Sequence, residues 1–254
     1  YKRQVIDEKW GKPTVVYGGG LSEDQIQSTR ELFDIEDTNN VYETSVDAND
    51  LYNYLGIAGG DTSSLISSVM VQKQDSGTGV KVKIITQSNI TKITSNQYAN
   101  AAITAGVSDV EIDVASVSKV TGESALTGVY KALEANGETL DPDRTQVAQD
   151  ELETTNEIAQ NNAYDSNFDS ARLDQALVEI KQELAQIKQN QGSAATTEQV
   201  EQVVQDALKK FNLSDIISQD DIDKLIAFAK KYQNTSAIDS VSYTHLTLPT
   251  TSRV

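Results

Sequence analysis

The stretch Leu65–Gln87 constrains the fold more than any other part of the chain. Its second half, Val80–Ile84, alternates apolar and charged residues with a period of two, which is typical of a strand that buries one face. A loop containing Gly77 and Gly79 separates it from an earlier apolar run, Ser67–Lys73, and this arrangement favours a β-hairpin. We therefore expect a mixed sheet with this hairpin at its centre.

Strand and helix patterns alternate on both sides of the hairpin. Further strands are predicted at 13–17, 41–46 and 109–114, and helices at 22–33, 48–55, 94–105 and 125–135. The helix at 94–105 is rich in alanine, and we expect it to pack closely on the sheet. Because it joins the hairpin to strand 109–114, this strand should lie parallel to one hairpin arm. Residues 1–138 are thus predicted to form an α+β domain.

The following region, residues 139–240, is predicted to be helical. Its helices are expected at 142–160, 171–190, 197–211 and 219–232. The helix at 171–190 carries a heptad seam of apolar residues, namely Leu173, Leu177, Ile180, Leu184 and Ile187. We favour packing of this seam within its own chain, since it spans only about three heptads. The alternative is self-association through 171–190.

The two ends of the chain look unusual. The final stretch, Val241–Val254, begins Val-Ser-Tyr-Thr-His-Leu, which is similar to a translated transposase-end sequencing adaptor, and we expect it to be a non-native tail. The single histidine, His245, lies in this stretch. Because the chain opens with Tyr1 rather than methionine, we also expect a processed or truncated product.

Composition excludes several classes of function. The formal charge is −17, from 38 acidic and 21 basic residues, so the chain should repel nucleic acid, whose affinity depends on Lys and Arg. There is no cysteine, and outside the tail there is no histidine, which excludes disulfides, thiolate chemistry and Ser-His-Asp catalysis. No apolar run approaches the roughly 20 residues of a membrane-spanning helix, so we predict no transmembrane segment.

Three short motifs have structural explanations that we prefer to functional ones. Gly18–Gly20 lacks the Lys-Ser/Thr of a phosphate loop, and a tight turn with closely crossing backbone explains it. Ser116–Lys119 matches the serine–lysine pattern of penicillin-binding enzymes, but its companion motifs are absent. Asp165–Asp169 resembles the start of a calcium loop but lacks the later glycine and glutamate. Capping of the next helix by Asp169 or Ser170 explains it better.

Four segments together resemble one bacterial family. They are Leu21–Gln25, Tyr98–Val107, Ser124–Ala132 and Glu151–Thr155. The family is catalogued as domain of unknown function 1002, is found mainly in Gram-positive bacteria of the Firmicutes type, and its members usually carry an export signal. The resemblance covers most of the chain from Trp10 to about Tyr232. It implies a location outside the membrane, secreted or at the cell envelope, and it carries over no activity and no site residue.

We therefore predict an exported, non-enzymatic binding or structural protein of the Gram-positive cell envelope, with an envelope polymer or protein as its partner. The alternative is a carboxylate-dependent cell-envelope hydrolase, since a glycosidase needs only two carboxylates about 5–9.5 Å apart. The sequence identifies no catalytic residue, no cofactor-binding residue and no metal ligand. Calcium binding elsewhere on the acidic surface stays open as a further alternative.

Overall fold

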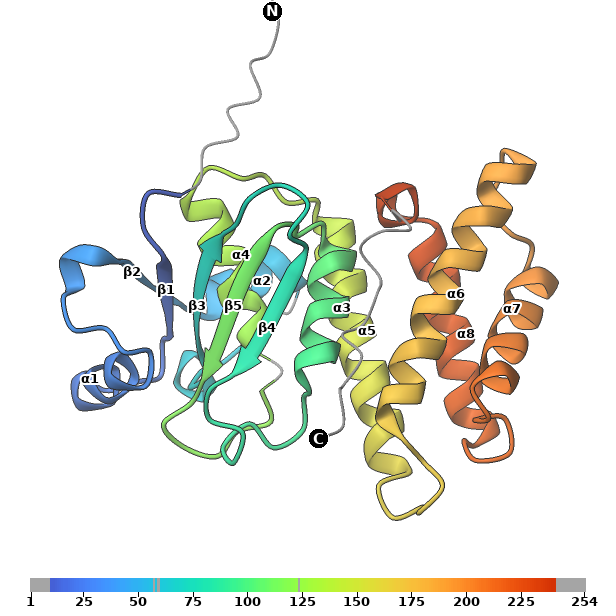
Figure 1. Ribbon diagram of the computed structural model, residues 1–254, viewed down its shortest axis with the longest axis horizontal. Helices are drawn as coiled ribbons and strands as arrows, with labels where there is room; N and C mark the ends of the chain where they lie inside the picture. The colour runs from blue at the N-terminus through green and yellow to red at the C-terminus, as the bar shows by residue number, and fades with distance from the viewer. Residues whose placement is uncertain (1–9, 57, 59, 123, 241–254) are drawn as a thin grey trace, which may run out of the picture. The chain divides into compact units, whose positions relative to one another are not determined.

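The computed structural model describes residues 10–56, 58, 60–122 and 124–240, so the predicted non-native tail lies outside the described residues. The chain divides into two compact units (Figure 1). The first unit comprises the segments up to residue 91 and 107–139, and the helical unit comprises 92–106 and the chain from 140 onward. Within the described ranges, every helix is too short or too polar to cross a lipid bilayer.

The first unit is built on a five-stranded mixed sheet with the order β2-β1-β3-β5-β4. Its strands are β1 Thr14–Gly18, β2 Tyr42–Val46, β3 Ser68–Lys73, β4 Val80–Ile84 and β5 Val110–Ala115. β1 pairs with β2 and β4 with β5 in parallel, while β3 is antiparallel to both of its neighbours. Together with the C-terminal helices, this sheet confirms the predicted α+β class.

The predicted hairpin at the centre of the sheet is wrong, because β5 lies between β3 and β4. Asp113 of β5 is opposite Met70 of β3 on one side and Lys83 of β4 on the other. β5 buries all of its apolar side chains, whereas both lysines of β4 are exposed. The more fully buried strand therefore takes the inner position, and the charged strand takes the edge. The predicted parallel pairing of strand 109–114 with one arm is confirmed by β4.

Helices cover both faces of β1, whose side chains are all buried. They are α1 Glu23–Leu32 and α4 Ala125–Ala135, while α2 Ala48–Leu55 packs against α4 and β2. α4 packs on one face, where Gly128 lies against Val16 and Val69. On the other face Val15 and Tyr17 share a core cluster with hydrophobic residues of α1 and the turn after it.

The three glycines after β1 allow segments of backbone to cross at close range. A Cβ atom added to Gly18 would lie 2.2 Å from the carbonyl oxygen of Leu65, and one added to Gly20 would lie 2.3 Å from that of Ser63. The amide of Gly20 donates a hydrogen bond to Leu65 O at 3.0 Å. The observed crossing agrees with the tight turn predicted for Gly18–Gly20.

The helical unit contains five α-helices and a short 3₁₀ helix among its described residues. They are α3 Ser95–Ala105, α5 Pro142–Asn161, α6 Ser170–Gln191, α7 Thr197–Lys210, α8 Gln219–Gln233 and η3 Ser236–Ser240. α3 begins with a capping box, in which Thr94 and Gln97 exchange hydrogen bonds. Its small residues pack against α5 and α6 within this unit, whereas the sequence pattern had suggested packing on the sheet.

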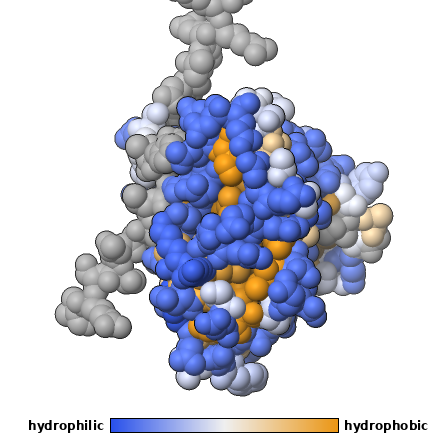
Figure 2. Space-filling model, turned by 90° about the vertical axis from the view of Figure 1, so that its right-hand side faces the viewer, coloured by the Kyte–Doolittle hydropathy of each residue, from blue (hydrophilic) through white to orange (hydrophobic). Residues whose placement is uncertain are grey.

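The heptad seam of α6 is buried inside the helical unit. Leu173, Leu177, Ile180 and Leu184 are at most 1% exposed and share a cluster with side chains of α7 and α8. This is the packing within one chain that we favoured, and self-association through 171–190 stays a prediction. Figure 2 shows a hydrophobic band on one face of the molecule. Partly buried hydrophobic residues at the edge of this core are Val203, Phe211, Ile216, Ile222 and Ile226.

Candidate functional site

The candidate site is an open hollow of about 480 Å³ on the surface of the helical unit. The C-terminal half of α6 forms one side and η3 forms the other. The lining residues are Gln182, Ala185, Gln186, Lys188, Gln189, Gly192, Ile238 and Asp239. The lining of the hollow therefore combines two apolar residues, Ala185 and Ile238, with the side-chain amides of three glutamines.

Three glutamines form a row along the α6 side of the hollow. Gln182, Gln186 and Gln189 are spaced four and three residues apart, so they lie on the same face of the helix. Each amide offers two donors and one carbonyl acceptor. Within the described part of the chain, none of these amides forms a hydrogen bond that would occupy it. The row can therefore bind a ligand that carries hydroxyl or amide groups.

An ion pair fixes η3 beside α6. Lys188 Nζ lies 2.6 Å from Asp239 Oδ1, and the neighbouring Ile238 is 3% exposed. The carboxylate of Asp239 is the only acidic group among the described lining residues, and the lysine neutralises it. The hollow thus presents neutral hydrogen-bonding groups rather than a concentrated charge.

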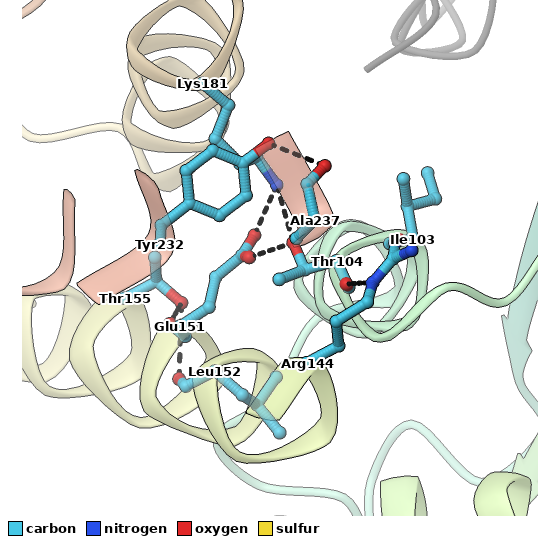
Figure 3. A network of polar contacts seen from close by, with 9 residues as sticks. All are labelled: Ile103, Thr104, Arg144, Glu151, Leu152, Thr155, Lys181, Tyr232 and Ala237. Carbon is cyan, nitrogen blue, oxygen red and sulfur yellow. Dashed lines mark hydrogen bonds and ion pairs between the residues drawn. The ribbon is translucent and has the colours of Figure 1, made fainter. Parts of the chain in front are cut away.

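A buried polar network anchors α6 on the side away from solvent (Figure 3). Lys181 Nζ donates to Glu151 Oε1 at 2.8 Å and to Thr104 Oγ1 at 3.1 Å. The Thr104 hydroxyl donates to the second oxygen of Glu151. The side chains of Lys181 and Glu151 are only 2% and 1% exposed. This network joins α3, α5 and α6, and it fixes the helix that carries Gln182 as the next residue.

The same network reaches η3 through Tyr232 of α8. The ring centroid of Tyr232 lies 6.0 Å from Lys181 Nζ, and its hydroxyl donates to Ala237 O at 3.4 Å (Figure 3). Burial strongly raises the pKa of Tyr232, so the phenol stays protonated and remains a donor. Both sides of the hollow are therefore attached to the same buried network.

Arg144 binds the C-terminal end of α3, the helix that carries Thr104 of the network. Its guanidinium donates to the carbonyl oxygens of Thr104 at 2.8 Å and Ile103 at 3.2 Å. A cation at a helix C-terminus satisfies orphan carbonyls and interacts favourably with the helix dipole. Burial lowers the pKa of Arg144, but an arginine remains charged at physiological pH.

Asp174 is a buried carboxyl group on α6, seven residues before Lys181. It is 2% exposed, and its Oδ1 atom has no hydrogen-bond partner among the described residues. Desolvation, reinforced by the negative charge of Glu151, raises the pKa of Asp174 to about 7, although Lys181 opposes this shift. The group has the pKa of a general acid, but it is not accessible to a substrate.

Residues of the Ser116–Lys119 and Asp165–Asp169 motifs have structural roles. Ser116 is buried and donates to Ser118 O at 2.7 Å, while Lys119 is exposed. Asp165 accepts from the amide of Asn167 at 2.8 Å. Asp169 is the N-cap of α6 and accepts from the amide of Ala171, as predicted for helix capping. The described residues contain no group of three or more His, Cys, Asp or Glu side chains suited to a metal ion.

Polar contacts in the first unit also stabilise the fold. Lys131 of α4 lies 2.7 Å from Asp50 of α2, and the Tyr54 hydroxyl donates to Glu134. These two contacts hold α2 against α4. Desolvation is the main cause of the strongly raised pKa of Tyr54, so this hydroxyl is a hydrogen-bond donor and not a base.

Comparison with known proteins gives a family and a relative. A family described as "Protein of unknown function (DUF1002)" matches residues 17–247. "Uncharacterized protein YpuA" from Bacillus subtilis (strain 168) is 30% identical over 239 residues, which cover 92% of this chain and 76% of that protein. No solved structure matches the chain.

Proposed function

We propose, since this chain belongs to the DUF1002 family of proteins of unknown function, that it is an exported, non-enzymatic binding protein of the Gram-positive cell envelope. The observation that carries this proposal is the row of glutamines in the hollow beside α6 and η3. The ligand we propose is an uncharged stretch of glycan or peptide in a wall polymer. Such a strand supplies the hydroxyl and amide groups that the glutamines can bind.

The geometry of the hollow supports binding of an extended chain. Gln182 and Gln189 are seven residues apart, which places them about 10 Å from each other along the helix axis. Ala185, which is partly exposed, offers apolar contact between the polar groups. The net charge of −17 disfavours an anionic polymer unless cations bridge the two surfaces. A neutral segment is therefore the better ligand.

Burial of the acidic groups weighs against the hydrolase alternative. A glycosidase needs two carboxyl groups on either side of the bond that it cleaves. Asp239 in the hollow is paired with Lys188, and the carboxyl groups of Glu151 and Asp174 are buried in the core. A substrate in the hollow would reach neither of the two buried acids.

Co-sedimentation of the full chain with purified Gram-positive cell walls tests this function. We expect the triple variant Gln182→Ala, Gln186→Ala and Gln189→Ala to bind about ten- to a thousandfold more weakly. Each lost hydrogen bond contributes about 0.5–1.5 kcal/mol. The control is Gln205→Ala, which removes an exposed glutamine from α7 outside the hollow and should leave binding unchanged.

Sedimentation with calcium and then with a chelator distinguishes binding through the glutamines from binding that is bridged by calcium. Binding that survives chelation and depends on the glutamines supports the proposal. Binding that requires calcium would point to the acidic surface instead. Full binding by the triple variant would refute the hollow as the site, and failure of the unmodified protein to sediment with walls would refute direct wall binding.

A further inference from the structure

The buried charges of the helical unit do not balance. Glu151, Asp174 and Asp221 contribute three buried carboxyl groups, and Lys181 contributes one ammonium group. All four are at most 2% exposed, and a buried charge is costly unless it is paired. Lys181 lies at 2.8 Å from Glu151, so this pair is neutral as a whole and leaves the carboxyl groups of Asp174 and Asp221 without a buried cation.

A second buried aspartate in the same unit shows how such a group can be satisfied. Asp221, which is 1% exposed, accepts hydrogen bonds from the side-chain amides of Asn161 at 2.9 Å and Asn162 at 3.4 Å. It also lies 3.4 Å from Lys224. Asp174 has no comparable donor for its Oδ1 atom within the described ranges. Its burial is therefore compatible with the neutral acid and unfavourable for the carboxylate.

Among the described residues, Lys181 is the one cation that favours the charged form of Asp174. α3 contains no acidic or basic residue, and Arg144 of α5 is engaged with carbonyl oxygens at the end of α3. The N-cap residue Asp169 adds a second negative influence on Asp174 besides Glu151. Other charged groups around α6 pair with one another near the surface, namely Glu179 with Lys210, Lys188 with Asp239, and Glu201 with Lys230.

We infer that Asp174 and the Glu151–Lys181 pair form a proton-dependent clamp that holds α6 in the helical unit. When Asp174 is protonated, the core contains one balanced ion pair and a neutral acid, and α6 packs fully. When Asp174 loses its proton, the core gains a second negative charge besides that of Glu151, and the Oδ1 atom of Asp174 has no partner among the described residues. Opening of the α6 segment to water then becomes the way to solvate that charge.

The direction of the pH dependence follows from the two states of Asp174. Burial and Glu151 raise its pKa to about 7 in the folded protein, compared with about 3.9 in an unfolded chain. The folded state therefore binds the proton more tightly than the unfolded state. The stabilising effect is complete below about pH 4 and is lost as the pH rises towards 7.

The test compares the full chain with Asp174→Asn, which keeps the shape and removes the charge. Backbone hydrogen exchange of α6 is measured between pH 5.5 and 8 and corrected for intrinsic exchange rates. We expect opening of α6 in the unmodified protein to increase about tenfold or more over this range. The asparagine variant should show no such increase. Glu183→Gln, an exposed acid on the same helix, is the matched control and should follow the unmodified protein.

Parallel profiles for the unmodified protein and the asparagine variant would overturn the clamp. If the asparagine variant does not fold, the pH titration of carboxyl ¹³C signals in aspartate-labelled, unmodified protein tests the inference instead. One buried aspartate signal with a midpoint between pH 6 and 8 supports the inference. Titration of every aspartate below pH 5 refutes it.

Discussion

Lys181→Met should lower the free energy of unfolding of the helical unit by about 3–5 kcal/mol. The methionine fills a similar volume, but it leaves the Glu151 carboxylate in the core without its cation. Lys181 Nζ is 2.8 Å from that carboxylate, and both side chains are almost fully buried. The loss therefore comes from an uncompensated buried charge and not from a cavity. Urea unfolding followed by far-ultraviolet circular dichroism measures it.

Lys231→Met is the matched control for this prediction. Lys231 lies 2.6 Å from the carboxylate of Asp150, but the two side chains are 64% and 37% exposed. Water screens such a surface pair, so the control should cost less than about 1 kcal/mol. The double variant Lys181→Met with Glu151→Met should recover part of the loss, because neither partner of the pair is then left alone. Equal losses for Lys181→Met and Lys231→Met would contradict the assigned role of burial.

Gly18→Ala should destabilise the first unit by about 3 kcal/mol or more, or prevent it from folding. The added Cβ atom would lie 2.2 Å from Leu65 O and 2.9 Å from the carbonyl carbon of Ile66. Both of these are backbone atoms, so relief requires movement of the main chain. Thermal unfolding monitored by the fluorescence of Trp10, the single tryptophan, reports the effect.

Gly11→Ala provides the comparison at a position without steric conflict. A Cβ atom at Gly11 has no heavy atom within 4 Å, and the substitution should change the unfolding temperature by no more than a few degrees. If Gly18→Ala unfolds at the same temperature as Gly11→Ala, the close crossing of the backbone at Leu65 is not as tight as described.

The starts and ends of helices could be predicted from the sequence because they are set by residues close together in the chain. The helices predicted at 22–33 and 94–105 begin at the N-cap residues Ser22 and Thr94, and the predicted helix at 171–190 differs from α6 by one residue at each end. The position of β5 could not be predicted in the same way. Nothing within Ser67–Ile84 indicates that a strand about thirty residues later in the chain inserts between its two arms. Pairing order is decided by competition between strands for the buried positions.

The candidate site was missed because its residues look ordinary in sequence. Gln182, Gln186 and Gln189 have the composition of a solvated helix face, and only the position of η3 turns that face into one side of a hollow. The sequence contains a weak signal of the buried charges on α6. Asp174 and Lys181 are charged residues seven positions apart, each directly after a residue of the heptad seam. This spacing places the two charges on one side of the helix, next to the seam, and only the structure shows that this side is buried.

The place of α3 in the chain has a consequence for synthesis on the ribosome. Residues 92–106, which carry α3, separate β4 from β5 along the chain but belong to the helical unit. When residue 91 has been translated, the sheet still lacks β5, which pairs with both β3 and β4. α3 cannot pack until α5 and α6, which follow β5 in the chain, have been translated. Neither unit can therefore be completed before translation of the other has begun, and no single cut in the chain yields both units intact.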